Sequence, residues 1–233
     1  GRRHSQLLSE GEEKRRPADS QRVGQFRDVD ARVELCVDQR AGAGKPFFLY
    51  VPLPAPHTPI LPSAEFYGKS GTNEYGDFVL MVDDVVRQIS DALERNGLTE
   101  NTLVIFTSDN GGLDGNGQPT DNAPLRSGKG YAYEGGIRVP FIARWPGVFP
   151  EGKISPEPIS SIDVFPTLLE ATGRAFPADN DIDGLSLLEH LKSGGQSTLE
   201  RDALLWHFPH YRHAPGPYSI IRQQDWKLIR FYE

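Results

Sequence analysis

Sulfur and long apolar runs are scarce in this sequence, and each scarcity excludes a class of protein. The single cysteine, Cys36, excludes an internal disulfide framework and any zinc site built from several cysteines. No stretch reaches the roughly 18 uninterrupted apolar residues that a membrane-spanning helix requires. The charged start, "GRRHSQLLSEGEEKRRP", contains no hydrophobic signal core. We therefore expect no membrane span.

An excess of basic residues is missing as well. The chain carries 25 Lys and Arg against 32 Asp and Glu, a formal net charge of -7. Nucleic acids and anionic membranes both need a concentrated basic face, so we expect neither as the main partner. The 37% apolar and 24% charged residues are ordinary for a globular protein, and 233 residues suffice to bury a core. Composition leaves the cellular compartment and the oligomeric state open.

The chain divides into three regions by composition. Residues 1–22 carry dense charge and few large apolar side chains, which is typical of a flexible arm or of a fragment of a larger structure. Residues 23–175 are predicted to form an α/β domain, and residues 176–233 a small antiparallel subdomain, complete or truncated. The first residue is Gly1 rather than methionine, so we expect a processed chain or a fragment.

Hydrophobic periodicity in residues 23–175 predicts alternating helices and strands. The clearest helix is at residues 77–96, and Asn96-Gly97 provides its C-terminal stop. The expected buried stripe of this helix consists of Val79, Val82, Val86, Ile89 and Leu93. Further helices are predicted at residues 28–39 and 163–173, and buried strands at 47–51, 103–107 and 139–145. This order predicts an α/β fold with a mostly parallel sheet flanked by helices.

The last part of the chain changes character. Three short apolar runs occur at residues 203–208, 218–222 and 226–232, and the last two are joined by the tight "QQD". Short runs separated by turn residues are typical of an antiparallel meander, which we expect here.

Two polar residues and two glycines follow the apolar run "LVIF" in the stretch "TSDNGG" (residues 107–112). Ligands of open α/β sheets lie beyond the carboxyl ends of the strands. The side-chain oxygens of Asp109 and Asn110 could both reach one Ca²⁺ or Mg²⁺, while the glycines let the backbone bend. Oxygen ligands disfavour zinc and copper. The same residues are typical of a simple turn, so a turn and a metal site remain alternatives.

A histidine and a lysine in two other loops are candidate partners of an anion. His57 lies in "APHTP", where Pro56 and Pro59 stiffen the chain and hold the imidazole in place. Lys129 lies between two glycines in "SGKGY", which lets its ammonium and the nearby N–H groups approach an oxyanion. The plain alternatives are a surface histidine and a solvated lysine.

The order of these segments is more informative than any one of them. The chain runs through "PFFLYVPLPAPHTP", a long helix, "TLVIFTSDNGG", "LRSGKGYAYEGGIRVPFIARWPG" and "SSIDVFPTLLEATG". This series resembles the type I sulfatases, the arylsulfatase-like branch of the alkaline phosphatase superfamily, over residues 47–231. The resemblance implies an alkaline-phosphatase-like α/β fold, present here as a partial domain.

The resemblance also implies hydrolysis of a sulfate ester by a formylglycine hydrate beside a Ca²⁺ ion, or Mg²⁺ in its place. Asp109 and Asn110 would then be two metal ligands, because "SDNGG" matches the Asp-Asn ligand motif of the family. Lys129 would contact the sulfate, and His57 would match the histidine near the leaving oxygen. The family implies a periplasmic, secreted or lysosomal location.

The sequence departs from the family at the nucleophile. The family motif, Cys-x-Pro-Ser-Arg, and the aspartate pair that completes the metal site normally precede the strand matching "PFFLY", and neither is present. "CVDQR" has the Cys-to-Arg spacing, but Asp38 replaces the proline and Gln39 the serine. Cys36 falls on the apolar side of a predicted helix and is interpreted as a core cysteine. We therefore expect the formylglycine in a missing N-terminal part.

The tail offers a candidate contact for the substrate. His207, His210, Arg212 and His213 cluster in "WHFPHYRHAPGPYSIIR" and could meet a sulfated sugar through charge-assisted contacts, or be solvated loop residues. This stretch resembles the tail of bacterial sulfatases that act on sulfated carbohydrates, which favours a glycan over a small aryl sulfate. We choose His210 as the substrate-binding residue. The alternatives are a phosphodiester or phosphonate monoester hydrolase of the same superfamily, and a catalytically inactive fragment.

Overall fold

The computed structural model of the chain describes residues 36–114, 120–177, 181–212 and 216–233. Contacts divide the chain into two compact units, Gly1–Thr99 and Glu100–Glu233. The predicted division into residues 1–22, 23–175 and 176–233 stays a prediction. Among the described residues, none of the helices combines the length and the apolar character that a membrane crossing demands.

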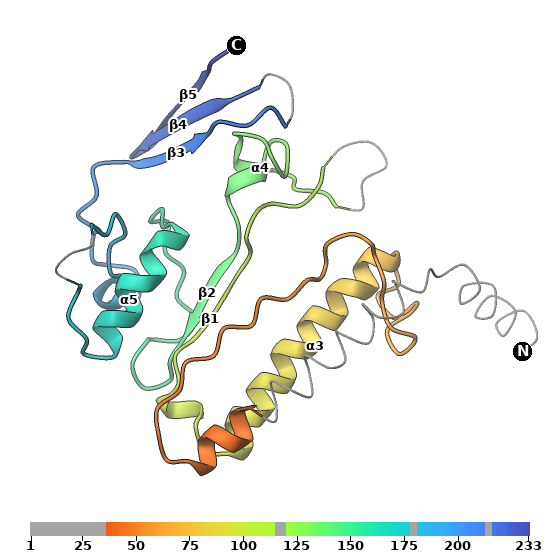
Figure 1. The fold of residues 1–233 in the computed structure, drawn as a ribbon, viewed down its shortest axis with the longest axis vertical. Coiled ribbons are helices and arrows are strands. Elements are labelled where there is room, and N and C mark those ends of the chain that lie inside the picture. The colour runs from red at the N-terminus through yellow and green to blue at the C-terminus, as the bar shows by residue number, and fades with distance from the viewer. Residues whose placement is uncertain (1–35, 115–119, 178–180, 213–215) are drawn as a thin grey trace, which may run out of the picture. The chain divides into compact units, whose positions relative to one another are not determined.

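The first unit is built on helix α3, Glu74–Arg95 (Figure 1). The Oδ1 atom of Asn73 accepts a hydrogen bond from the Gly76 N–H at 2.9 Å and caps the first turn. The helix ends at Arg95 with Asn96 as its C-cap, and Gly97 follows with a φ of 64°, the left-handed conformation that favours glycine. The helix predicted at residues 77–96 is confirmed.

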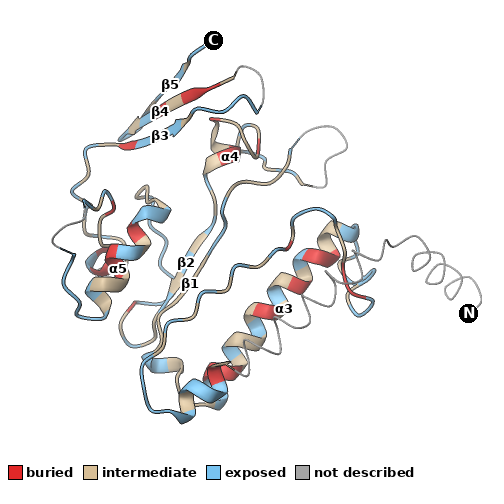
Figure 2. Ribbon diagram, in the orientation of Figure 1, coloured by how far each residue is buried: buried red, intermediate tan, exposed pale blue. Residues whose placement is uncertain are grey.

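The buried face of α3 is rotated from the expected one. Phe78, Met81 and Val85 form its core, against which Leu53, Ile60, Phe66, Val82 and Ile89 pack. Figure 2 shows the buried residues as patches along one side of the helix. Val79, expected in the stripe, is 40% exposed, because the segment that contains Leu53 to Phe66 covers the side of the helix that bears Phe78.

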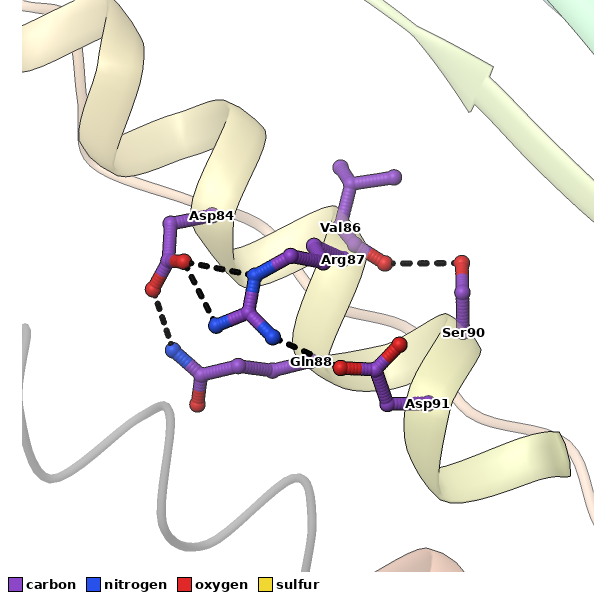
Figure 3. A network of polar contacts seen from close by, with 6 residues as sticks. All are labelled: Asp84, Val86, Arg87, Gln88, Ser90 and Asp91. Carbon is purple, nitrogen blue, oxygen red and sulfur yellow. Dashed lines mark hydrogen bonds and ion pairs between the residues drawn. The ribbon is translucent and has the colours of Figure 1, made fainter. Parts of the chain in front are cut away.

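The opposite face of α3 carries a chain of ion pairs (Figure 3). Arg87 lies between Asp84 and Asp91, with N–O distances of 2.7 and 2.6 Å. The hydrogen bond from Arg87 to Asp84 raises the pKa of the guanidinium. Exposed pairs of this kind contribute little to stability, so they mark the solvent side of the helix rather than hold it in place.

Asp77 ties the start of α3 to the preceding loop. Its carboxylate is buried and accepts hydrogen bonds from the backbone N–H groups of Gly68 and Ser70, both at 2.8 Å. The bond from Ser70 is the main cause that holds the pKa of Asp77 below its ordinary value, since bonds to the charged form favour that form.

We expect this carboxylate to make the stability of the chain sensitive to acid. A group whose pKa is lowered on folding stabilises the folded state above its unfolded pKa, here 3.8, and loses that effect as the pH falls through its folded pKa. Asp77→Asn should therefore unfold more easily at neutral pH, and its disadvantage should shrink below pH 3.8. Urea unfolding at a series of pH values measures this. Asp83→Asn, an exposed acid on the same helix, is the control and should change neither quantity.

The segment before α3 corrects one prediction. Residues 36–42 are helical, and the rest of the helix predicted at 28–39 lies outside the described residues. Val37 is fully buried there, whereas Cys36, expected in the core, is only partly buried. The strand predicted at residues 47–51 is wrong, because this segment joins no ladder among the described residues. Phe48 and Tyr50 are each 75% exposed.

The second unit contains strands β1, Val104–Thr107, and β2, Phe141–Arg144. Both strands were predicted, at residues 103–107 and 139–145. They pair antiparallel, with Thr107 opposite Phe141, whereas a mostly parallel sheet was expected. The one helix in the described part of the connection is the short α4, Glu134–Ile137, after which β2 runs back along β1. The expected parallel partner at 47–51 is not paired within the described part.

The helix predicted at residues 163–173 is confirmed as η2, Ser161–Asp163, followed by α5, Val164–Ala171. Asp163 is fully buried between the two and forms an ion pair with Arg201. Its carboxylate also accepts the backbone N–H groups of Ser160 and Leu185, at 2.7 and 2.9 Å, so the buried charge is compensated. The short elements α6, Leu188–Lys192, and η1, Thr99–Asn101, were not predicted.

The tail forms a three-stranded antiparallel sheet, as predicted. Its strands are β3, Leu204–Phe208, β4, Tyr218–Gln223, and β5, Trp226–Phe231, in the order β3-β4-β5. Its inner face packs against the segment before and within α4 through a cluster of apolar side chains. The buried members of this cluster are Ala132, Tyr218 and Ile220, and Ile137, Trp206, Phe208, Ile229 and Phe231 pack against them.

Candidate active site

The loop after β1 presents two side chains with oxygen atoms next to each other. Asp109 is exposed, and its carboxylate makes no hydrogen bond or ion pair with a described residue. The Ser108 hydroxyl donates to the Asn110 carbonyl at 3.0 Å and fixes the turn. Asn110 Nδ2 donates to the Gly111 carbonyl at 3.1 Å, which leaves its Oδ1 atom without a described donor. Both side chains therefore offer unused acceptors.

These acceptors suit a hard cation such as Ca²⁺ or Mg²⁺ in kind. They do not complete a coordination shell, since Ca²⁺ takes about six to eight oxygen ligands. Within the described ranges, no three His, Cys, Asp or Glu side chains gather at one point that could hold a metal. The loop could supply two ligands of a cation site, and the other ligands would come from elsewhere.

The glycines around this loop are needed for space. A Cβ on Gly111 would lie 1.7 Å from the carbonyl oxygen of Gly135, and a Cβ on Gly135 would lie 1.8 Å from that of Ser127. The Gly111 N–H donates to the Gly136 carbonyl at 3.0 Å. Neither Gly111 nor Gly135 has a left-handed φ. Close contact between main chains, rather than a simple turn, therefore explains these two glycines.

Backbone hydrogen bonds join the Lys129 segment to the same loop. The Lys129 N–H donates to the Gly112 carbonyl at 2.9 Å, and Asn122 Nδ2 donates to that oxygen at the same distance. The Lys129 side chain is partly exposed, and its ammonium pairs with no acid among the described residues. The backbone of Lys129 is thus bonded to the loop that contains Asp109 and Asn110, and its side chain brings a positive charge that no described acid compensates.

His57 belongs to the first unit and is exposed in the loop that precedes α3. Its Nδ1 atom lies 2.7 Å from the carbonyl oxygen of Thr58. A carbonyl can only accept, so Nδ1 carries a proton, and Nε2 is the nitrogen available to a ligand. The His57 N–H also donates to the Pro54 carbonyl at 3.2 Å, which holds the loop around the imidazole.

The predicted histidine cluster of the tail is divided. His207, on β3, bonds through Nδ1 to the Ser219 hydroxyl at 2.8 Å. His210 instead lies against the ring of Phe208, with the ring centroids 4.9 Å apart. Since His207 and Phe208 are successive residues of a strand, their side chains lie on opposite faces of the sheet. Arg212 is exposed and His213 lies outside the described residues.

An aromatic stack links His210 with the Lys129 segment. Phe208 stacks on Tyr218 with ring centroids 5.1 Å apart, and the Tyr218 hydroxyl lies 3.4 Å from the carbonyl oxygen of Gly130. Burial raises the pKa of Tyr218, against a smaller opposing effect of Arg212, so the phenol stays protonated and able to donate. His210 is thus connected through two rings with the residue after Lys129.

Three charged residues beside the site were missed from the sequence. Lys227 Nζ lies 2.8 Å from one carboxylate oxygen of Glu134, and a guanidinium nitrogen of Arg222 lies 3.7 Å from the other. Glu134 and Lys227 are 93 positions apart, and single charges are too common for any pattern to pair them. A stacked pair was also missed: the guanidinium of Arg126 lies 3.7 Å from the ring centroid of Tyr133.

Both halves of the chain match known families. Residues 10–174 match the sulfatase family, and residues 127–233 match the family described as N-sulphoglucosamine sulphohydrolase, C-terminal. A protein named sulfatase from Formosa agariphila is 37% identical over 84% of this chain and 40% of its own length. N-acetylgalactosamine-6-sulfatase from Canis lupus familiaris is 42% identical over 70% of this chain and 31% of its own length.

Solved structures similar to this chain also include sulfatases. The crystal structure of Ps i-CgsB in complex with k-i-k-neocarrahexaose matches 88% of this chain and 46% of that one, with a TM-score of 0.78 and 30% identity. BT4656 in complex with its substrate, D-glucosamine-2-N,6-O-disulfate, matches 69% of this chain and 31% of that one, with a TM-score of 0.57 and 30% identity. The phosphonate monoester hydrolase SpPMH from Silicibacter pomeroyi matches 68% of this chain and 32% of that one, with a TM-score of 0.53 and 24% identity, and so shares the fold.

The chain spans less than half the length of these relatives. Its match to the sulfatase family model covers residues 10–174 and includes β1, β2 and α5. The predicted alkaline-phosphatase-like fold is thereby confirmed at the level of the family, although the described strands β1 and β2 pair antiparallel. The chain belongs to the sulfatase family and has the alkaline-phosphatase-like α/β fold of that family, with a small antiparallel sheet at its C-terminal side.

Proposed function

We propose that the protein hydrolyses sulfuric esters and that this chain contributes the metal-binding loop and the sulfate-binding lysine. The observation that carries the proposal is that residues 109–112 can provide two oxygen ligands and also bind the backbone of the Lys129 segment. This loop offers the unused oxygens of Asp109 and Asn110, and its Gly112 carbonyl holds the backbone of Lys129 at 2.9 Å. A pair of cation ligands and a free ammonium in one small region suit a doubly charged anionic group.

Asp109 and Asn110 would hold Ca²⁺ or Mg²⁺. When bound, the cation would supply positive charge that polarises the sulfate and stabilises the charge that develops in the transition state. The nucleophile expected for this chemistry, a formylglycine, stays a prediction that concerns residues beyond this sequence.

Lys129 and His57 are proposed to act on the substrate through nitrogen atoms that are free among the described residues, each judged within its own unit. The Lys129 ammonium, which no described acid neutralises, would donate to a sulfate oxygen. His57 would contact the ester oxygen that leaves. With Nδ1 held by the Thr58 carbonyl, a protonated imidazole can donate through Nε2 to that oxygen as its negative charge grows.

A sulfated carbohydrate is the proposed substrate. BT4656 is named for a sulfated glucosamine substrate, and N-acetylgalactosamine-6-sulfatase is named for a sulfated amino sugar. His210, exposed and packed edge-on against Phe208, would donate to a hydroxyl or sulfate group of the sugar. The periplasmic, secreted or lysosomal location that the family implies also stays a prediction.

A comparison of ester types tests the proposal. We expect the complete gene product to hydrolyse 4-nitrophenyl sulfate with a kcat/KM on the order of 100-fold above that for phenyl phosphonate and phosphodiester analogues. The shared fold of the phosphonate monoester hydrolase makes the reverse ranking the relevant alternative. If phosphonate were the better substrate, the sulfatase assignment would be wrong. Absence of turnover with every ester would favour the inactive alternative.

A further inference from the structure

We propose that the ion pair between Glu134 and Lys227 is a positioning device through which the C-terminal sheet holds the active-site loops in place. The inference rests on the proposed function of Asp109, Asn110 and Lys129. It assigns to Glu134 and Lys227 a role that acts through these residues rather than on the substrate.

The ion pair between Glu134 and Lys227 is largely buried. Lys227, on β5, donates to Glu134 Oε1 at 2.8 Å, and only 17% of the lysine side chain and 30% of the glutamate side chain are exposed. Arg222, on β4, adds a second positive charge 3.7 Å from the other oxygen of Glu134. Two strands of one sheet therefore hold the same carboxylate. Partly buried charges are screened less by water and salt than exposed ones.

The helix that carries Glu134 cannot hold its own position. Helix α4 has 4 residues, and the Tyr133 side chain at its N-cap forms no capping hydrogen bond. A single turn with two glycines is too short to be stable by propensity alone. Ala132 and Ile137 pack against the sheet, and Glu134 forms ion pairs with Lys227 and Arg222; these contacts help attach the segment to the sheet.

The same helix is in contact with both active-site loops. The Gly135 N–H donates to the Arg126 carbonyl at 2.9 Å, three residues before Lys129. The Gly136 carbonyl accepts the Gly111 N–H at 3.0 Å, next to Asn110. With no room for a Cβ at Gly111 or Gly135, a shift of α4 must move both loops. The sheet therefore determines the positions of the metal ligands and of Lys129 through one short helix.

Hydrogen exchange of the complete gene product tests the positioning role without relying on activity. In Lys227→Met and in Glu134→Gln we expect the amides of residues 126–136 to exchange about tenfold faster, while those of α5 keep the wild-type rate. Glu134→Gln removes both ion pairs with little change in volume. Arg230→Met, which removes an exposed charge from the outer face of β5, is the matched control and should leave residues 126–136 unchanged.

Faster exchange throughout the chain would show that the pair stabilises the whole fold, and unchanged exchange at residues 126–136 would show that it holds nothing there. Either result overturns the proposal. Both are independent of turnover, so the inference can fail or hold separately from the proposed function.

Kinetics provide the second arm. We expect Lys227→Met and Glu134→Gln each to lower kcat for a sulfate ester about tenfold, because misplaced catalytic groups reduce the rate after binding. The double variant should lose no more than Glu134→Gln alone, since the two residues act as one unit. Losses that multiply in the double variant, or a kcat equal to that of Arg230→Met, would contradict a shared positioning role.

Discussion

Asp109→Ala should abolish the response of the protein to Ca²⁺ and its ester hydrolysis together. The Asp109 carboxylate is exposed and bonds to no described residue, so its removal should leave the fold intact. A catalytic cation contributes several kcal/mol, which corresponds to a loss of about 10³-fold or more in kcat/KM. The measurements are kcat/KM for a sulfate ester and the thermal shift produced by Ca²⁺, which reports binding without turnover.

Asp202→Ala is the matched control for this experiment. Asp202 is also an exposed aspartate of the second unit, so its removal changes the net charge equally. We expect both its kcat/KM and its thermal shift with Ca²⁺ to equal those of the wild type. Wild-type turnover in Asp109→Ala would refute the metal assignment, and a retained thermal shift would show that the cation binds elsewhere.

Lys129→Ala should lower kcat/KM by about 10²- to 10³-fold, the effect of removing one donor to a developing oxyanion, or about 3 to 4 kcal/mol. The backbone N–H that bonds the Gly112 carbonyl is kept, so the loop should retain its position. Thermal unfolding with and without Ca²⁺ should therefore match the wild type. Steady-state kinetics with a sulfate ester provide the measurement.

The type of substitution separates charge from shape at this position. Lys129→Arg keeps the positive charge and should recover part of the loss, whereas Lys129→Met keeps the length and should not. Lys153→Ala, at an exposed lysine, should behave as the wild type. Equal kcat/KM values for Lys129→Met and the wild type would remove Lys129 from the sulfate site.

Elements specified by nearby residues could be predicted from the sequence. Helix α3 has its cap at Asn73, its period and its stop at Gly97 within one continuous stretch, and the meander of the tail has its strands next to each other. The segment at residues 47–51 was predicted wrongly because a strand needs a neighbour, which an apolar run alone does not specify. The position of Val79 on α3 was wrong because the covering loop, not the helix, decides which side is buried.

The candidate site could be predicted only in part, because its residues lie in short local motifs whereas the contacts between them are distant in sequence. Residue type made Asp109, Asn110 and Lys129 candidates beside a simple turn and a solvated lysine, and only the resemblance of "SDNGG" and "GKG" to the sulfatases selected them. The structure joins their loops through the Gly112 carbonyl. The contacts that hold them were not predictable, because Glu134 and Lys227 meet only after the tail has folded back over 93 positions. The predicted histidine cluster is divided because successive strand residues alternate between faces: His207 lies on one face of the sheet, and His210 packs against Phe208, which lies on the other.

The glycine contacts between residues 111 and 135 affect how the protein can vary. Where two main chains touch with no side chain between them, their separation at that point is set by backbone contact rather than by the size of a side chain. Exposed residues of the same unit, such as His210, can change in size without altering this backbone contact. Under the proposed function, such a scaffold would let the side chains that contact a substrate diverge while the backbone that carries Asp109 and Lys129 keeps its geometry.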